Sequence, residues 1–287
     1  MRFDYLEPKT ITEALSLLRK YKRDAKVIAG GTDVMVQARN KTIKPDYLVD
    51  ITNIPSLDYI RYNNKHGLRI GALTTIRALE ISAELQNRYP IISQAAGQLG
   101  SVAIRNVATL GGNLCNGLPS AETAQVMLAL SAEAKIIGPN GERYVPFADF
   151  FTGTGKTVLK PDELLIEIKV PKLQPNSFGK YIKHSPRGTI DLAIVNITVI
   201  ITLETDKRIC RNASIVLGAV APTPLKAKKA EKVLKGKKIT EELINIAAQA
   251  AYDEVYPRED SIRGSVEYKR EMVRVLTARA IKEIMAR

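Results

Sequence analysis

The alternation of apolar and polar positions predicts short strands and helices in the first half of the chain. Thr10 is followed by Glu13 at the spacing of a capping box, and apolar residues then recur with a helical period. Apolar runs that end in glycine, or that flank turns rich in Asn and Gly, are typical of strands and hairpins. We therefore expect strands or hairpins at 25–31, 47–52, 58–73 and 134–147, and helices at 10–21, 32–39, 74–82 and 120–134.

Two of these helices begin with polar residues that suit an N-cap. Thr32 or Asp33 is expected to cap the helix at 32–39, and Ser120 the helix at 120–134. Residues 98–119 break the periodic pattern and contain four glycines. A long, glycine-rich segment without periodicity inside a compact domain is usually functional.

The second half of the chain has the pattern of strands followed by helices. Apolar and polar residues alternate over 195–204, which predicts a half-buried strand, and a turn at Asp206-Lys207 leads to a partner strand at 213–221. Helices are expected at 226–235, 240–254 and 265–285. Pro and Asn cluster at 173–178, so we predict two domains, 1–175 and 176–287, with an α+β arrangement in the second.

Cysteine and histidine, the usual ligands of zinc and of iron–sulfur clusters, are scarce in this sequence. Its 287 residues include only two cysteines, Cys115 and Cys210, and two histidines, His66 and His184. A zinc site or an iron–sulfur cluster held by this chain alone is therefore not expected. The start of the chain lacks the apolar stretch of a signal peptide, and the longest apolar run, 192–201, is too short to span a bilayer. We expect a cytoplasmic protein.

The formal net charge of +13 raises the question of an anionic partner. The densest basic block, 226–238, holds seven lysines but no arginine and no aromatic residue. Reading of bases needs Arg or amide side chains, and stacking needs aromatic rings. The block therefore favours a solvated helix face over a nucleic-acid patch, although a basic nucleic-acid-binding protein stays open as a rival function.

Two Gly-Gly pairs carry the strongest chemical signal. Each follows apolar residues and precedes a polar one, in VIAGGTDV at 27–34 and TLGGN at 109–113. Glycine has no Cβ, so a ligand can lie against the backbone, and successive amides can hold an anion. Neither loop matches GxGxxG or GxxxxGK[ST], so a Rossmann fingerprint and a P-loop are both poor fits there. The alternatives are two tight turns, or a groove between two glycine loops that binds a phosphate-bearing ligand.

Five segments together resemble a known family. They are VIAGGTDV at 27–34, IRNVATLGGNLCNGLPSAE at 104–122, PDELLIEI at 161–168, the YIKH and DLAIVN segments within 181–196, and DSIRGSVEYKREMV at 260–273. Their content and order are similar to the FAD-binding, medium subunits of the molybdenum hydroxylases. That family includes xanthine dehydrogenase and aerobic carbon monoxide dehydrogenase, and the resemblance covers nearly the whole chain.

The resemblance implies a fold and a set of FAD contacts. The implied fold is a two-subdomain FAD-binding region of the vanillyl-alcohol-oxidase type, followed by a small domain with a three-stranded sheet and three helices. The first loop would wrap the FAD pyrophosphate, and the second would lie along the cofactor. Leu99, Leu165 and Lys183 would lie near the flavin or adenine, and Glu122 occupies a position that is commonly Asp. The implied FAD-binding residues are Val27, Ile28, Ala29, Gly30, Gly31, Thr32, Asp33, Val34, Leu99, Thr109, Leu110, Gly111, Gly112, Asn113, Glu122, Leu165 and Lys183.

The same resemblance implies electron transfer within a complex. A large molybdopterin subunit would oxidise the substrate, and a small subunit with [2Fe–2S] clusters would pass electrons to FAD on this chain. The FAD would then reduce NAD⁺, a quinone or another acceptor. We expect non-covalent FAD, because Cys115 is the only candidate attachment residue near the glycine loops. A stand-alone FAD-dependent oxidase or reductase with its own substrate pocket remains the alternative.

Overall fold

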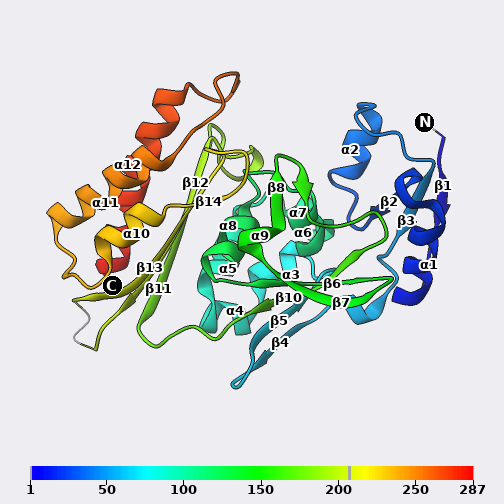
Figure 1. Cartoon of the computed structure of the whole chain (residues 1–287), viewed down its shortest axis with the longest axis horizontal. Helices are drawn as coiled ribbons and strands as arrows, with labels where there is room; N and C mark the ends of the chain where they lie inside the picture. Colours follow the sequence, from blue (N-terminus) through cyan, green and yellow to red (C-terminus); the bar gives the residue numbers. More distant parts are fainter. Residues whose placement is uncertain (1, 206–207, 287) are drawn as a thin grey trace.

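The computed structural model describes residues 2–205 and 208–286, which form three units along the long axis of the molecule (Figure 1). The N-terminal unit contains a three-stranded parallel sheet in the order β1-β3-β2. Thr10 caps its first helix, because the Thr10 hydroxyl accepts a hydrogen bond from the Glu13 amide, as predicted. The elements are β1 (Asp4–Leu6), α1 (Ile11–Tyr21), β2 (Ala25–Ile28), α2 (Val34–Arg39) and β3 (Tyr47–Asp50).

The middle unit is built on a five-stranded antiparallel sheet in the order β4-β5-β10-β6-β7. Both predicted hairpins are present in it, and the short helices pack against the sheet in one hydrophobic core. The strands are β4 (Ile60–Asn63), β5 (Gly67–Gly71), β6 (Glu133–Gly138), β7 (Gly141–Pro146), β8 (Phe151–Gly153), β9 (Lys156–Thr157) and β10 (Leu164–Val170). The helices are α3 (Ile76–Ile81), α4 (Ala83–Arg88), α5 (Pro90–Gly97), α6 (Val102–Val107), α7 (Leu110–Cys115), α8 (Glu122–Ala129) and α9 (Phe147–Phe150).

The C-terminal unit is an antiparallel sheet covered by three helices, at the opposite end of the molecule from the N-terminal unit (Figure 1). The sheet has the three expected long strands, β11 (Ser177–His184), β12 (Val195–Leu203) and β13 (Cys210–Gly218), and a fourth strand, β14, of two residues (Leu225–Lys226). The helices are α10 (Lys228–Leu234), α11 (Glu241–Glu254) and α12 (Val266–Met285). The predicted turn at Asp206-Lys207 lies outside the described residues. No helix within 2–205 and 208–286 is long and apolar enough to cross a membrane.

The expectation that β12 is half-buried is wrong. Every residue of this strand is buried, including Asn196, Thr198 and Thr202. Helices α10, α11 and α12 share a core with one face of the sheet, while α8 contacts β12 and β13 from the middle unit. The polar positions that resemble a solvent face therefore lie at the contact between two units. This contact fixes the C-terminal unit against the helices that carry the candidate site.

Three predictions about the segments that carry the two Gly-Gly pairs, and about the helices next to them, also need correction. Residues 98–119 contain two short helices, α6 and α7, and the second Gly-Gly pair lies in α7. The helix predicted at 120–134 ends at Ala129, and Ala121 occupies the N-cap in place of Ser120. Asp33 holds the N-cap position of α2, but its side chain makes no capping hydrogen bond. The signals placed these elements correctly along the chain, but tertiary contacts set their type and their ends.

Candidate functional site

A cavity of about 710 Å³ lies where the N-terminal and middle units meet the start of the C-terminal unit. This volume is in the range typical of small-molecule and cofactor sites. Its walls come from the loop after β2, the turn after α5, helix α7, the start of α8, the segment from β8 to β10 and the turn after β11. Segments far apart in the sequence thus form one site.

Fourteen of the seventeen residues that the sequence suggested line this cavity. Ile28, Leu110 and Lys183 do not. The side chains of Ile28 and Leu110 are buried in the protein interior, and that of Lys183 is buried in an ion pair. These three residues therefore lie behind the cavity wall, and their contacts with FAD stay a prediction.

The loop after β2 offers unused backbone donors to the cavity. Gly31 has φ +68°, a conformation that favours glycine, and among the described residues the amides of Gly31, Thr32 and Asp33 have no acceptor. Gly30 is required for packing, since a Cβ there would lie 1.9 Å from the carbonyl oxygen of Val107. The loop is thus held against α6 while its amides remain available for an anion.

The second Gly-Gly pair works differently from the expected amide cradle. The amides of Leu110, Gly111 and Gly112 donate to Thr74 O, Ala72 O and the Thr109 hydroxyl. A Cβ on Gly111 would lie 2.7 Å from Ala72 O, so this glycine allows α7 to lie close to Ala72, the residue that follows β5. Gly112 is exposed and lines the cavity, and a Cβ there would meet only the Thr109 hydroxyl. This motif therefore supplies a bare surface to the cavity, and its amides serve the fold.

Three exposed lysines, Lys26, Lys156 and Lys160, line the cavity beside these loops. None of these lysines was predicted as a site residue. Lys156 could have been, because the sequence TGTGKT at 152–157 places glycine, lysine and threonine together as phosphate sites often do. Asp33 also lines the cavity, and burial raises the pKa of its carboxyl while a hydrogen bond from Asn116 opposes the rise. Further wall residues that were not named as site residues are Ile104 and Asn116, in the 104–122 segment, and Asp191 and Leu192, in the DLAIVN segment, while Ile190 had no sequence signal.

The resemblance found in the sequence implies FAD as the ligand of this cavity. We expect the Lys26→Met substitution to weaken FAD binding roughly fivefold, equivalent to about 1 kcal/mol, because an exposed cation contributes modestly to binding a phosphate. The measurement is the FAD dissociation constant, determined by quenching of flavin fluorescence. Lys44→Met is the matched control, since Lys44 is exposed and lies outside the cavity wall. An equal change in both variants would contradict the role of Lys26.

Glu122 and Lys183 form a buried ion pair behind the cavity. The distance from Lys183 Nζ to Glu122 Oε1 is 2.7 Å, and their side chains are 1% and 5% exposed, respectively. Burial raises the pKa of the Glu122 carboxyl, and the Lys183 ammonium opposes that rise. Lys183 also donates to the carbonyls of Gln98 and Thr189, so its three N–H groups are all used. Only Glu122 faces the cavity; Lys183 holds the wall from behind.

The two other reactive side chains considered from the sequence do not form a catalytic set. Cys115 lines the cavity, and burial raises the pKa of its thiol to about 12, so the thiol stays protonated at neutral pH. His184 lies outside the cavity wall, and its Nε2 is 2.7 Å from the hydroxyl of Tyr268. Neither side chain therefore supplies an activated nucleophile or base to the cavity.

Comparison with known families decides what this cavity is. Residues 1–173 match the family described as the FAD binding domain in molybdopterin dehydrogenase. Residues 180–284 match the CO dehydrogenase flavoprotein C-terminal domain. The chain belongs to the flavoprotein subunits of the molybdopterin dehydrogenases. The resemblance stated from the sequence is confirmed, and so are the implied fold class and the assignment to the oxidoreductases.

Individual relatives of this flavoprotein subunit align over their full lengths. The carbon monoxide dehydrogenase medium chain of Hydrogenophaga pseudoflava is 34% identical over 286 residues, which cover 100% of this chain and 98% of the relative. The xanthine dehydrogenase FAD-binding subunit of Escherichia coli O157:H7 is 31% identical and covers 98% and 96%. The solved carbon monoxide dehydrogenase of Hydrogenophaga pseudoflava superposes with a TM-score of 0.95, at 34% identity and coverage of 100% and 98%. Quinoline 2-oxidoreductase from Pseudomonas putida 86 gives 0.92, at 28% identity and the same coverage.

The cavity of this flavoprotein subunit fits FAD by its own chemistry. The free amides of the loop after β2 and the exposed lysines of the cavity wall suit an anionic pyrophosphate. Leu99, Ile104 and Leu165 form apolar wall that suits an aromatic ring. Gly112 leaves space for the cofactor along α7. When bound, FAD supplies the redox chemistry, and the protein supplies binding and orientation.

Proposed function

We propose that this chain is the FAD-carrying electron-transfer subunit of a molybdenum-containing dehydrogenase complex. Electrons would reach its FAD from [2Fe–2S] clusters of a small subunit, after substrate oxidation on a large molybdopterin subunit. The FAD would then reduce NAD⁺, a quinone or another acceptor. The observation that carries the proposal is the cavity, which joins both glycine motifs to Leu99 and Leu165 within a chain that matches flavoprotein subunits end to end.

Partner subunits follow from the ligand count of the chain. A [2Fe–2S] cluster needs four cysteine or histidine ligands, and this chain has two cysteines and two histidines in total. Two of these four residues are held apart in different units: Cys210 begins β13, and Cys115 ends α7. The clusters are therefore assigned to other chains. The molybdopterin is assigned to another chain because both family matches of this chain are to flavoprotein domains.

Within the chain, we assign the FAD contacts by what each wall segment offers. The amides of Gly31, Thr32 and Asp33 would hold the pyrophosphate, Gly112 would lie along the cofactor, and Leu99 and Leu165 would contact its rings. The FAD would be non-covalent, since Cys115 lines the cavity as a neutral thiol. We retain 1–175 and 176–287 as the two domains, supported by family matches that end at 173 and begin at 180. A cytoplasmic location is supported by the two unpaired cysteines.

The direct test is purification of the tagged chain from its own cells under mild conditions. We expect it to copurify with one chain that contains molybdopterin and one that contains [2Fe–2S] clusters, both identified by mass spectrometry and metal analysis. A fully active substrate-oxidising enzyme obtained from this chain alone would support the stand-alone flavoenzyme and refute the proposal.

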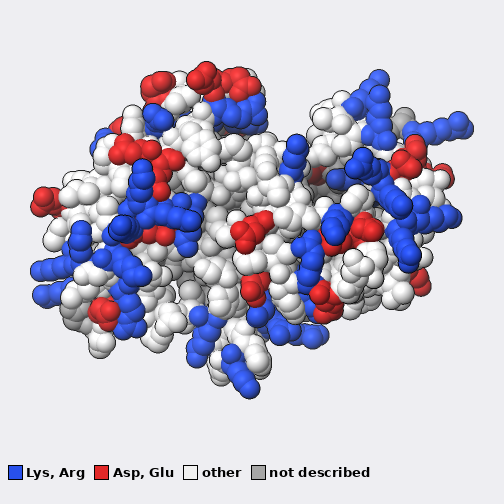
Figure 2. Space-filling view, viewed as in Figure 1, with Lys and Arg blue, Asp and Glu red and all other residues white. Residues whose placement is uncertain are grey.

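The basic C-terminal helix gives a second, weaker prediction. Figure 2 shows Lys and Arg side chains gathered at the C-terminal end of the molecule, and Lys228, Lys229 and Lys232 of α10 are exposed while Ala230 and Leu234 are buried. Charge reversal of the three lysines is expected to weaken assembly less than tenfold, mainly through a slower, salt-dependent association rate. Association kinetics at two salt concentrations measure this. Tight, salt-resistant binding of the chain to DNA or RNA would contradict this account of the basic surface.

A further inference from the structure

Three successive carbonyl groups in the turn after α5 are held by two buried cations. Lys183 Nζ donates to Gln98 O at 2.9 Å, and a guanidinium nitrogen of Arg105 donates to Leu99 O at 3.0 Å and to Gly100 O at 2.8 Å. Each cation has its own carboxylate: Lys183 pairs with Glu122 at 2.7 Å, and Arg105 Nε with Glu80 at 2.8 Å. A turn of three residues is thus fastened by two ion pairs from four different elements.

The buried ion pairs are costly to form unless their hydrogen bonds are complete. Arg105 is 7% exposed and uses its guanidinium on Glu80 and on both carbonyls. Partial burial acts to raise the pKa of the Glu80 carboxyl, but Arg77 and Arg105 outweigh it and hold this pKa below its usual range. Glu80 is therefore ionised at neutral pH, and the Arg105 guanidinium is fixed between it and the turn.

This turn forms part of the cavity wall. Leu99 and Gly100 line the cavity, whereas Arg105 and Lys183 do not. In a trans peptide the carbonyl and the next amide point in opposite directions. Since Leu99 O points to Arg105, the Gly100 amide points away from it, and this amide has no acceptor among the described residues. Gly100 has φ +52°, which glycine adopts without strain.

The apolar part of the cavity lies beside the same turn. Lys183 bonds the carbonyls of both Gln98 and Thr189, which brings the turn close to Ile190 and Leu192, both of them wall residues. Leu99 and Ile104 complete this apolar surface. The flavin ring is the largest apolar part of FAD, so this end of the cavity suits the ring, while the free amides at 31–33 suit the phosphates.

We infer that Arg105 and Lys183 are positioning residues that hold the 98–100 turn so that Leu99 packs on the flavin ring and the Gly100 amide donates to a ring acceptor. This inference rests on the proposed function. A cation behind the peptide polarises its amide, and the reduced flavin ring carries more negative charge than the oxidised ring. The 98–100 turn, held by these two cations, therefore binds reduced FAD more tightly than oxidised FAD, which raises the reduction potential of the flavin.

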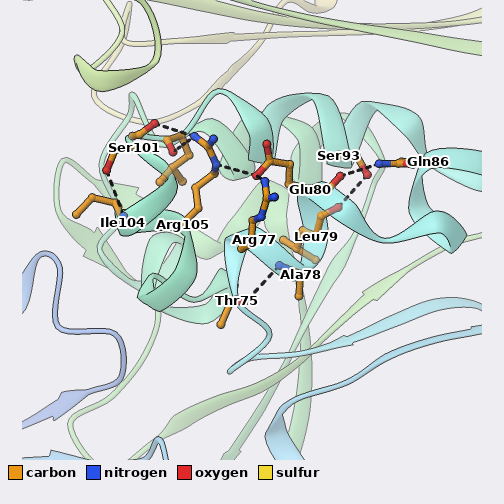
Figure 3. A network of polar contacts seen from close by, with 12 residues as sticks. Thr75, Arg77, Ala78, Leu79, Glu80, Gln86, Ser93, Ser101, Ile104 and Arg105 are labelled. Atoms are coloured by element: carbon orange, nitrogen blue, oxygen red, sulfur yellow. Dashed lines mark hydrogen bonds and ion pairs between the residues drawn. The ribbon is translucent and has the colours of Figure 1, made fainter.

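Arg77 provides a matched control for Arg105. Figure 3 shows that both arginines reach Glu80, and Arg77 lies 2.8 Å from the same carboxylate oxygen. Arg77 makes no hydrogen bond to the turn among the bonds of the described residues. Arg77→Met thus removes one charge from the network and leaves the turn fastened, whereas Arg105→Met releases two carbonyls.

The test is a spectroelectrochemical titration of the full chain loaded with FAD. We expect Arg105→Met to weaken binding of reduced FAD about tenfold more than binding of oxidised FAD, which lowers the two-electron midpoint potential by about 30 mV. Arg105→Lys should give a smaller shift, because a lysine keeps the charge but not the planar fork. Arg77→Met should leave the potential unchanged. Equal shifts in Arg105→Met and Arg77→Met, or no shift in either, would overturn the inference.

Hydrogen exchange of the unmodified protein tests the same inference without a substitution. Binding of FAD is expected to slow exchange of the Gly100 amide at least tenfold, with no comparable change at Gly141, which begins β7 and lies outside the cavity wall. If FAD binds and exchange at Gly100 is unchanged, the inference is wrong while the proposed function stands. If the chain takes up no FAD, the proposed function itself fails.

Discussion

Replacement of Lys183 by Met is expected to destabilise the folded chain by roughly 3–5 kcal/mol, the cost of leaving one member of a buried ion pair without its partner. Glu122 would keep a buried carboxylate with no cation, and the carbonyls of Gln98 and Thr189 would lose their donor. The free energy of unfolding, from urea titration of the apoprotein, measures the effect. Arg88→Met is the control, because the Arg88–Glu84 pair is exposed and its loss should cost less than about 1 kcal/mol.

The pH dependence of the Lys183→Met variant has a defined sign. Without the ammonium, burial and the negative charge of Asp33 both raise the pKa of the Glu122 carboxyl in the folded state. A group whose folded pKa is raised contributes stability below its unfolded pKa and loses it as the pH rises through the folded pKa. The deficit of the variant should therefore shrink at acidic pH and be largest at neutral pH. The double variant Glu122→Gln, Lys183→Met should recover most of the lost stability, and an unrecovered deficit would contradict the ion-pair explanation.

The two glycines of the second motif are expected to differ sharply when each is changed to Val. Gly111→Val should destabilise the fold by about 3 kcal/mol, since the new Cβ would overlap the carbonyl oxygen of Ala72 and force α7 away from that residue. Gly112→Val should fold with a loss of no more than about 1 kcal/mol from the Thr109 cap, because the rest of its side chain would enter the cavity. It should nevertheless bind FAD at least about a hundredfold more weakly.

Urea titration and FAD titration of the two variants separate these effects. Normal flavin content in folded Gly112→Val would show that the cofactor does not lie along α7. A folded Gly111→Val variant with the free energy of unfolding of the unmodified protein would show that the close contact between α7 and Ala72 is not required. Each variant is the matched control of the other, because both place the same side chain at adjacent positions. Opposite effects on stability and on FAD binding would therefore report the different surroundings of the two residues.

The sequence allowed the local elements and much of the cavity wall to be predicted because their signals are local. The capping spacing of Thr10 and Glu13, the Asn and Gly turns of both hairpins, and the first Gly-Gly loop act within a few residues. The α+β arrangement of the second domain came from its pattern of strands followed by helices. The two-part FAD-binding region came from the family resemblance. These features required no knowledge of which distant segments meet.

The failures all involve partners distant in the sequence. The 109–113 motif appeared to be a loop, but Ala72 and Thr74, far earlier in the chain, accept its amides and fix a helix. β12 appeared half-buried because its second covering layer, α8, belongs to another unit. The hydrogen bonds of the Lys183 ammonium to Glu122 and to two carbonyls also join distant segments and had no sequence signal, while its placement near the flavin stays a prediction.

Cofactor analysis of the chain alone and of the assembled complex tests the central claim most directly. The account predicts about one FAD per chain in both samples, released into solution by acid precipitation, with iron and molybdenum present only in the complex. Reduction of the complex through its molybdenum subunit should bleach the flavin absorbance, while the isolated chain should stay oxidised under the same conditions. A chain that holds no flavin, or that alone contains the metals and oxidises the substrate, would contradict the account.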